Sequence, residues 1–202
     1  MKQKVFVIGF QKTGTTSLEH ALQKLGYRVY GGDKNLMKFD NTQELKNYIS
    51  KTLLSWDVVQ DMPWPLFYKE LYELYPDAKF ILTIRDTDKW IRSVVNYFAS
   101  IRIPLHRKIY HVPCAEGHEE AYMSLYDKHN HEVQEFFRDK ENFKVMKPGQ
   151  NFDFSTLCEF LDINEVPEGS FPHARNNKKR KLPNYKWYRD LRSIYWNFKK
   201  KY

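Results

Sequence analysis

The chain has 202 residues, of which 42% are hydrophobic and 16% aromatic, a composition that predicts one globular domain over residues 1–202. No apolar run approaches the roughly 18 residues that span a bilayer, so we expect neither a transmembrane helix nor a signal peptide. The net charge of +8 is concentrated, because residues 175–202 hold eleven Lys or Arg and one Asp. A basic C-terminal segment, rather than a basic surface, argues against general nucleic-acid binding.

The two cysteines, Cys114 and Cys158, are isolated in sequence and form no CxxC motif. Isolated cysteines do not indicate a disulfide framework, and they fit a reducing compartment. We therefore expect a cytoplasmic protein.

Strand and helix patterns alternate along the first half of the chain. Short apolar and β-branched runs predict strands at 5–8, 27–30, 58–60 and 79–84. Apolar residues at helical spacing, with Asn41 and Thr87 as N-caps, predict helices at 15–25, 42–54, 65–75 and after 87. This alternation predicts an α/β fold of three layers, with a central parallel sheet of about four or five strands flanked by helices.

The second half of the chain is less regular. Residues 103–117 contain two prolines, two histidines and no clean period, so we expect a loop or lid there. His106 and His111 in this segment are candidates for substrate contact, although exposed histidines without a ligand are the commoner case. Apolar spacing predicts a long helix, a strand and a short helix at 118–139, 143–146 and 154–161.

The segment between the first strand and the first helix is a candidate anion-binding loop. Gly9 and Gly14 match the glycines of the phosphate-binding pattern GxxxxGK[ST], and Thr16 matches its Ser/Thr. Thr15 stands where that pattern has its lysine, and the only lysine of the loop is Lys12. A helix N-terminus offers unpaired N–H groups to an anion. Further hydrogen-bond donors are the hydroxyls of Thr13, Thr15, Thr16 and Ser17.

Arg85 stands just past the strand at 79–84, at the edge where ligands gather in open α/β sheets, and Ser93 lies eight residues further on. An arginine fork suits a phosphate monoester, and a serine adds a hydroxyl. The ordinary alternative is a surface ion pair between this arginine and Asp86 or Asp88.

Asp61 follows the strand at 58–60 on the same edge of the sheet. In a purely structural role it would cap the helix that begins after Pro63. In a functional role it would coordinate magnesium, as in an NTPase, or act as a general base.

Taken together, these three stretches resemble the sulfotransferases that use 3′-phosphoadenosine 5′-phosphosulfate (PAPS). The 5′-phosphosulfate loop of that superfamily has the form PKSGTTW, which is matched here by Gln11, Lys12, Thr13, Gly14, Thr15, Thr16 and Ser17. Its 3′-phosphate motif, an Arg after a strand and a Ser eight residues later, is matched by Arg85 and Ser93. Ser17 replaces an aromatic residue of the family, so that contact is missing.

Cytosolic members of the superfamily place a catalytic histidine in a THLP segment, which corresponds here to Gln60-Asp61-Met62-Pro63. Asp61 therefore takes the position of the base. A compact subfamily with this change resembles the chain further in the stretch DMPWPLFYKELYELYPDAKFILTIRD, in HN at 129–130 and in FPH at 171–173.

The resemblance implies an enzyme that moves a sulfuryl group in line from PAPS to a hydroxyl or amine, leaving 3′,5′-adenosine bisphosphate. The acceptor would be a small molecule or a glycan. Asp61 would be the general base, Lys12 would stabilise the leaving phosphate, and no metal would be needed. A basic segment would close over the nucleotide through Arg175, Asn176 and Lys178, although the run 178–181 is equally compatible with a solvated charged surface.

Two other functions stay open. A P-loop kinase or NTPase would use Mg-ATP with Asp61 as a magnesium ligand, and the missing lysine of GK[ST] argues against it. A module that binds an anionic membrane or nucleic acid through its basic tail is the non-enzymatic alternative. No metal site is convincing, since His118 lacks the second histidine of HExxH and His129 and His131 lie two apart in a helix. The sequence carries no readable code for the acceptor or the oligomeric state.

Overall fold

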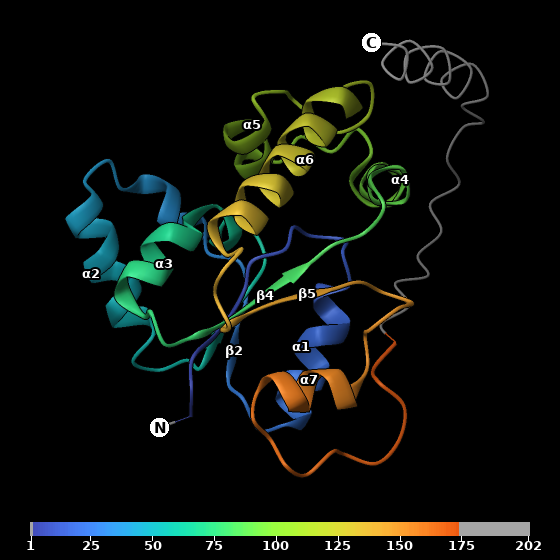
Figure 1. The fold of residues 1–202 in the computed structure, drawn as a ribbon. Coiled ribbons are helices and arrows are strands. Elements are labelled where there is room, and N and C mark those ends of the chain that lie inside the picture. The colour runs from blue at the N-terminus through green and yellow to red at the C-terminus, as the bar shows by residue number, and fades with distance from the viewer. Residues whose placement is uncertain (1, 174–202) are drawn as a thin grey trace.

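The computed structural model describes residues 2–173 and has a five-stranded parallel sheet with helices on both faces (Figure 1). The strands stand in the order β2-β3-β1-β4-β5. Because β1 lies between β3 and β4, the strand order reverses at β1, and ligands bind at such a switch point in open α/β sheets. The strands are β1 (Val5–Val7), β2 (Val29–Tyr30), β3 (Val58–Val59), β4 (Lys79–Thr83) and β5 (Phe143–Met146).

Residues 2–173 also form seven α-helices and two short 3₁₀ helices, all of which lie between strands except α7, which follows β5. The 3₁₀ helices are η1 (Lys34–Lys38) and η2 (Trp64–Phe67). The α-helices are α1 (Thr15–Lys24), α2 (Thr42–Thr52), α3 (Tyr68–Leu74), α4 (Thr87–Phe98), α5 (Pro104–Tyr110), α6 (Glu119–Phe136) and α7 (Phe154–Phe160).

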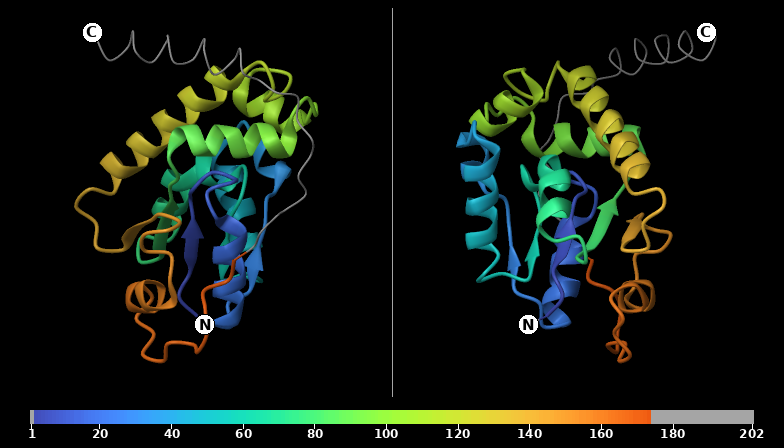
Figure 2. Two further views of the ribbon diagram at one scale, coloured as in Figure 1. Left: turned by 90° about the vertical axis from the view of Figure 1, so that its right-hand side faces the viewer. Right: turned by 60° about the vertical axis from the view of Figure 1, so that its left-hand side comes forward.

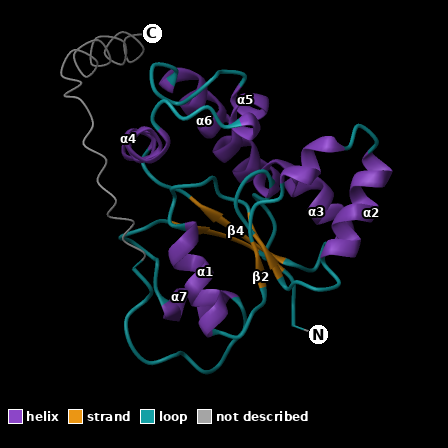
Figure 3. Cartoon of the chain, turned by 180° about the vertical axis from the view of Figure 1, so that it is seen from behind, coloured by secondary structure: helices purple, strands orange, loops and turns teal. Residues whose placement is uncertain are grey.

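Alternating strand side chains divide the interior into two cores, as the two-residue period of a strand requires. Phe6 and Phe80 pack with apolar residues of α2, α3 and the end of α6. Val5 and Ile81 point to the opposite face and pack with α1 and α7. The view from behind shows α1 and α7 on one face of the sheet and α2 and α3 on the other (Figure 3). The expected three-layer α/β fold is confirmed.

A further group of helices covers the carboxyl edge of the sheet. Buried aromatic rings of α4, α5 and α6 pack around Phe10, which follows β1. Trp90 stacks on Tyr126 with ring centroids 4.0 Å apart, and Tyr110 stacks on Tyr122 at 3.7 Å. These helices, green to yellow in Figure 2, gather at the end of the molecule away from α7. This aromatic layer therefore covers the carboxyl edge of the sheet, where a ligand would bind.

The segment 103–117 is not the irregular loop that the sequence predicts, because residues 104–110 form helix α5. Pro104 occupies the first turn, where the missing N–H of proline costs no hydrogen bond. Ile109 and Tyr110 are buried against the aromatic layer, so tertiary packing supplies the order that no sequence period announced.

The N-terminal caps agree with the sequence in one case and not in another. Asn41 caps α2 as expected, and its side chain accepts hydrogen bonds from two backbone N–H groups of the first turn. Thr87 was the expected cap of α4, but Asp86 caps that helix by accepting from Lys89 N at 2.9 Å. Thr87 instead donates its hydroxyl to Asp127 on α6 at 2.6 Å.

Within residues 2–173, no helix is both long and apolar enough to cross a bilayer. The basic segment 175–202, and with it the candidates Arg175, Asn176 and Lys178, lies outside the described residues.

Candidate functional site

The loop between β1 and α1 is a tight turn at the carboxyl edge of the sheet. At Gly9 an added Cβ would stand 2.0 Å from Thr83 Oγ1 on β4, so only glycine fits. Gly14, which precedes α1, has a φ of 102°, and an added Cβ there would stand 3.0 Å from the Phe152 ring. Lys12 has a φ of 69°, a left-handed backbone that is costly for a residue other than glycine. Such strain is typical of ligand-binding loops.

The hydroxyl residues of this loop differ in what they can offer a ligand. Thr13 is fully buried, and its Oγ1 donates to Phe10 O at 2.5 Å and lies 2.6 Å from Thr83 Oγ1. This hydroxyl therefore fastens the loop to β4. Thr15 is buried, Thr16 is exposed, and Ser17 lines the cavity beside the loop. No side chain of residues 2–173 caps α1, and a helix N-terminus without a side-chain cap is suited to binding an anion.

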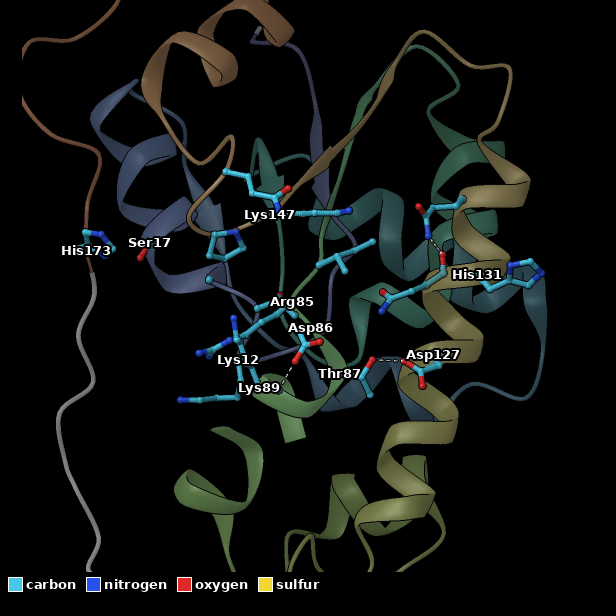
Figure 4. Close-up of a pocket in the computed structure, with 17 residues that line it drawn as sticks. Lys12, Ser17, Arg85, Asp86, Thr87, Lys89, Asp127, His131, Lys147 and His173 are labelled. Atoms are coloured by element: carbon cyan, nitrogen blue, oxygen red, sulfur yellow. Dashed lines mark hydrogen bonds between the residues drawn. The ribbon is translucent and has the colours of Figure 1, made fainter. Parts of the chain in front are cut away.

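A cavity of about 930 Å³ opens beside this loop and is lined by residues from five parts of the chain. Of the site residues expected from sequence, it is lined by Lys12, Thr13, Gly14, Ser17 and Arg85. Lys89 and Lys147 add two further cations, and α6 contributes polar residues on the opposite side (Figure 4). Gln11, Thr15, Thr16, Asp61 and Ser93 do not line this cavity. Its concentration of positive charge suits an anionic ligand.

The charges of Arg85 and Asp61 act on Lys12 in opposite directions. Burial and the nearby charge of Arg85 lower the pKa of Lys12, whereas the charge of Asp61 raises it. The ammonium group lies 3.9 Å from the centre of the Tyr97 ring, a cation–π contact that orients the side chain. Figure 4 shows Lys12 and Arg85 close together at one side of the cavity.

Asp61 follows β3 and also has a left-handed backbone, with a φ of 66°. Burial raises the pKa of Asp61, and the N–H of Met62 at 2.9 Å and the charge of Lys12 offset part of that rise. A carboxylate with a raised pKa is a stronger base than one in water. The position and environment of this side chain therefore suit proton abstraction beside Lys12.

Gln11 belongs to the loop but points away from the cavity. Its amide nitrogen donates to Tyr110 Oη at 2.7 Å, and its backbone carbonyl accepts from Trp90 Nε1 at 2.8 Å. These bonds attach the loop to α5 and α4. Asp61 and Gln11 both interact with Tyr110, since the charge of Asp61 contributes to the raised pKa of that phenol.

The side chain of His129 on α6 bonds to the backbone just before the β1–α1 loop, a role that the sequence analysis does not predict. Its Nε2 lies 2.8 Å from the carbonyl oxygen of Ile8, 121 residues away, and its ring packs on Phe10 with centroids 4.5 Å apart. Burial lowers the pKa of His129 to about 4, so the ring is neutral at pH 7 and Nε2 carries the proton that it donates. The sequence signalled this residue only through the HN dipeptide of the resemblance.

The histidines of segment 103–117 differ from expectation. His106 is not an exposed loop residue but a buried one in α5, with Nδ1 3.2 Å from Tyr122 Oη. Burial lowers the pKa of His106 to about 4, which keeps it neutral in the aromatic layer. His111 is exposed and ends α5 with a φ of 57°.

The candidate residues Trp64, Tyr68 and Ser93 lie in the core or in helices and do not line the cavity. Trp64 and Tyr68, which follow Asp61, are buried in the core, and Trp64 Nε1 donates to Gly31 O at 2.9 Å. Ser93 is partly buried in α4. Among residues 2–173, no three His, Cys, Asp or Glu side chains gather closely enough to hold a metal ion.

Comparison with known proteins gives two findings. A family model described as a sulfotransferase domain matches residues 4–180, which include the β1–α1 loop, Asp61 and Arg85. The Ava biosynthesis cluster protein M of Aspergillus versicolor is 27% identical over 215 residues, a match that covers 84% of this chain and 80% of that protein.

Proposed function

Because the chain belongs to the sulfotransferase domain family, we propose that it transfers a sulfuryl group from PAPS to a hydroxyl or amine of a small-molecule or glycan acceptor. The observation that carries this proposal is that Lys12 and Arg85 line the same cavity, while the charge of Asp61 also acts on Lys12. A cation influenced by both the cavity arginine and this carboxylate suits the place where donor and acceptor would meet.

The cavity suits an anionic nucleotide because of its cations and because a helix N-terminus lies beside it. Lys12, Arg85, Lys89 and Lys147 surround it, and the uncapped N-terminus of α1 opens beside it. We assign the 5′-phosphosulfate to residues 11–17 and the 3′-phosphate to Arg85 and Ser93. Arg175, Asn176 and Lys178 are proposed to close over the nucleotide.

Lys12 is proposed to stabilise the charge that develops on the bridging oxygen as the sulfuryl group leaves. Its contact with Tyr97 holds the ammonium in one orientation, which limits the reorganisation needed at the transition state. Its lowered pKa also favours transfer of a proton toward the leaving phosphate.

Asp61 is proposed to take the proton of the acceptor. Its raised pKa brings the carboxylate closer to the pH at which it works, as general-base catalysis requires. The sulfuryl group carries one negative charge, so Lys12, Arg85 and the loop N–H groups are expected to suffice without a metal. We therefore expect full activity in EDTA.

The test is calorimetric titration in EDTA of the full chain with 3′,5′-adenosine bisphosphate, 5′-AMP and ATP. We expect the bisphosphate to bind tightest and Arg85→Ala to remove that preference. Arg92→Ala is the matched control, because Arg92 is an exposed arginine of α4 that does not line the cavity. Preference for ATP with Mg²⁺ and indifference to the 3′-phosphate would replace the proposal with a P-loop kinase, in which Asp61 holds magnesium.

A further inference from the structure

Asn130 is a buried polar residue of α6 that faces the cavity without a full set of hydrogen bonds. It lines the cavity and is only 7% exposed. Its Oδ1 atom has no hydrogen-bond partner within residues 2–173. A buried carbonyl oxygen without a donor is destabilising, so an unpaired one in a cavity wall points to a ligand.

The neighbouring hydroxyl of Tyr126 determines which way the Asn130 amide is turned. Tyr126 Oη donates its single proton to Arg85 O at 2.9 Å and accepts from Arg85 N at 2.9 Å. The side chain of Asn130, one helical turn further on, acts on this hydroxyl and lowers the pKa of the phenol. With its proton already used, the hydroxyl can only accept from the Asn130 amide nitrogen. Turning the amide over would place two acceptors together, so Oδ1 must be the atom left without a donor.

The surroundings restrict what could donate to this oxygen. The cavity's anion-binding side is formed by Lys12, Arg85, Lys89 and Lys147, whereas Asn130 belongs to the α6 wall with Asp127 and Gln134. The Gln134 amide nitrogen donates to the backbone oxygen Asn130 O at 2.8 Å and makes no hydrogen bond to Oδ1. Asp127 has only acceptor oxygens when ionised. No donor of residues 2–173 reaches Oδ1, so a bound ligand can supply the missing partner.

We propose that Asn130 Oδ1 accepts a hydrogen bond from an N–H or O–H group of the bound nucleotide and so selects the nucleoside part of the donor. This inference rests on the proposed function, in which the cavity binds an adenosine bisphosphate. The phosphates of such a ligand supply only acceptors at neutral pH. The remaining donors of the nucleoside are the ribose 2′-hydroxyl and the exocyclic amino group of the base.

The experiment compares three ligands by calorimetry in the full chain. They are adenosine 3′,5′-bisphosphate, its 2′-deoxy analogue, and purine riboside 3′,5′-bisphosphate, which lacks only the amino group. We expect one analogue to bind about fivefold to tenfold more weakly than the parent, the size of one neutral hydrogen bond. In Asn130→Ala the parent should bind as weakly as that analogue, and the difference between the two should disappear.

Two variants separate recognition from a merely structural role. Asn130→Asp keeps an acceptor oxygen, so it should preserve the discrimination between ligands while the added charge weakens binding of all three. Ser124→Ala changes an exposed residue of the same helix that does not line the cavity and should keep both affinity and discrimination.

Equal affinity of the unmodified chain for all three ligands would overturn the proposal without any variant. So would discrimination that survives in Asn130→Ala. Failure of the unmodified chain to bind adenosine 3′,5′-bisphosphate would overturn the proposed function and this inference together, whereas tight binding without discrimination would remove only the inference.

Discussion

The carboxyl edge of the sheet and the helical layer above it contribute to the site in different ways. The edge supplies charge, through Lys12, Asp61 and Arg85, each of which follows a strand. The layer of α5 and α6 supplies position, through neutral buried groups such as His129 and Tyr110 that bond to the β1–α1 loop. We therefore expect the residues proposed to react and the residues that hold them in place to be separable by mutation. Changes at the edge should affect turnover, and changes in the layer should also affect stability.

The strongest test of this difference is Asp61→Asn. If the carboxylate is the general base, we expect kcat to fall by about 10²–10⁴-fold. The free energy of unfolding should not fall, because the variant removes a buried charge and leaves a side chain of the same shape. Steady-state kinetics with PAPS and chemical denaturation of the same samples would measure both quantities. A large loss of stability with unchanged kcat would place Asp61 among the structural residues.

The pH dependence of the unmodified chain sharpens the same test. The folded-state pKa of Asp61 is raised above 3.8, so activity should fall as the pH drops through that raised value and the base becomes protonated. Between 3.8 and the raised value, the folded state binds the proton more tightly than the unfolded chain does. The contribution of Asp61 to the free energy of unfolding should therefore decrease as pH rises through this window. This trend should be absent from Asp61→Asn.

Lys12→Ala should have the next largest effect on turnover. Loss of one donor to a developing charge typically lowers the rate by about 10²–10³-fold. Stability should change little, because the cation–π contact with Tyr97 lies at a partly exposed ring. Lys51→Ala on the exposed face of α2 is the matched control and should leave both kcat and stability unchanged. Equal rates for Lys12→Ala and the unmodified chain would contradict the assigned role.

His129→Leu should have the smallest effect on chemistry and the clearest effect on stability. It leaves the carbonyl of Ile8 without its donor, which we expect to cost about 1–3 kcal/mol in the free energy of unfolding. His131→Ala, two residues further along α6 and exposed, should leave that free energy unchanged. Urea denaturation of the three proteins gives the comparison. Equal stability of the two variants would show that α6 does not hold the loop.

Much of the sheet edge was predictable because its signals are local. Glycines at 9 and 14 mark a backbone that a side chain would obstruct, and Arg85 and Asp61 follow runs that read clearly as strands. The helical layer was less predictable, because the two prolines and two histidines of 103–117 interrupt the apolar spacing that would indicate helix α5. Burial of Ile109 and Tyr110 against rings from other helices decides that segment, and no pattern within it reports those neighbours.

The amino-acid sequence is enough to predict the alternation of strands and helices in the first half of the chain, the phosphate-loop pattern with its displaced lysine, and the sheet edge where charged residues gather. Hydrophobic period, glycine placement and strand ends encode these features within a few neighbouring residues. The bond of His129 to Ile8 across 121 residues, and the unpaired oxygen of Asn130 in the cavity wall, follow from the tertiary structure alone. Such contacts depend on how α6 crosses the sheet edge, and the distance between partners along the chain leaves them without a local signature.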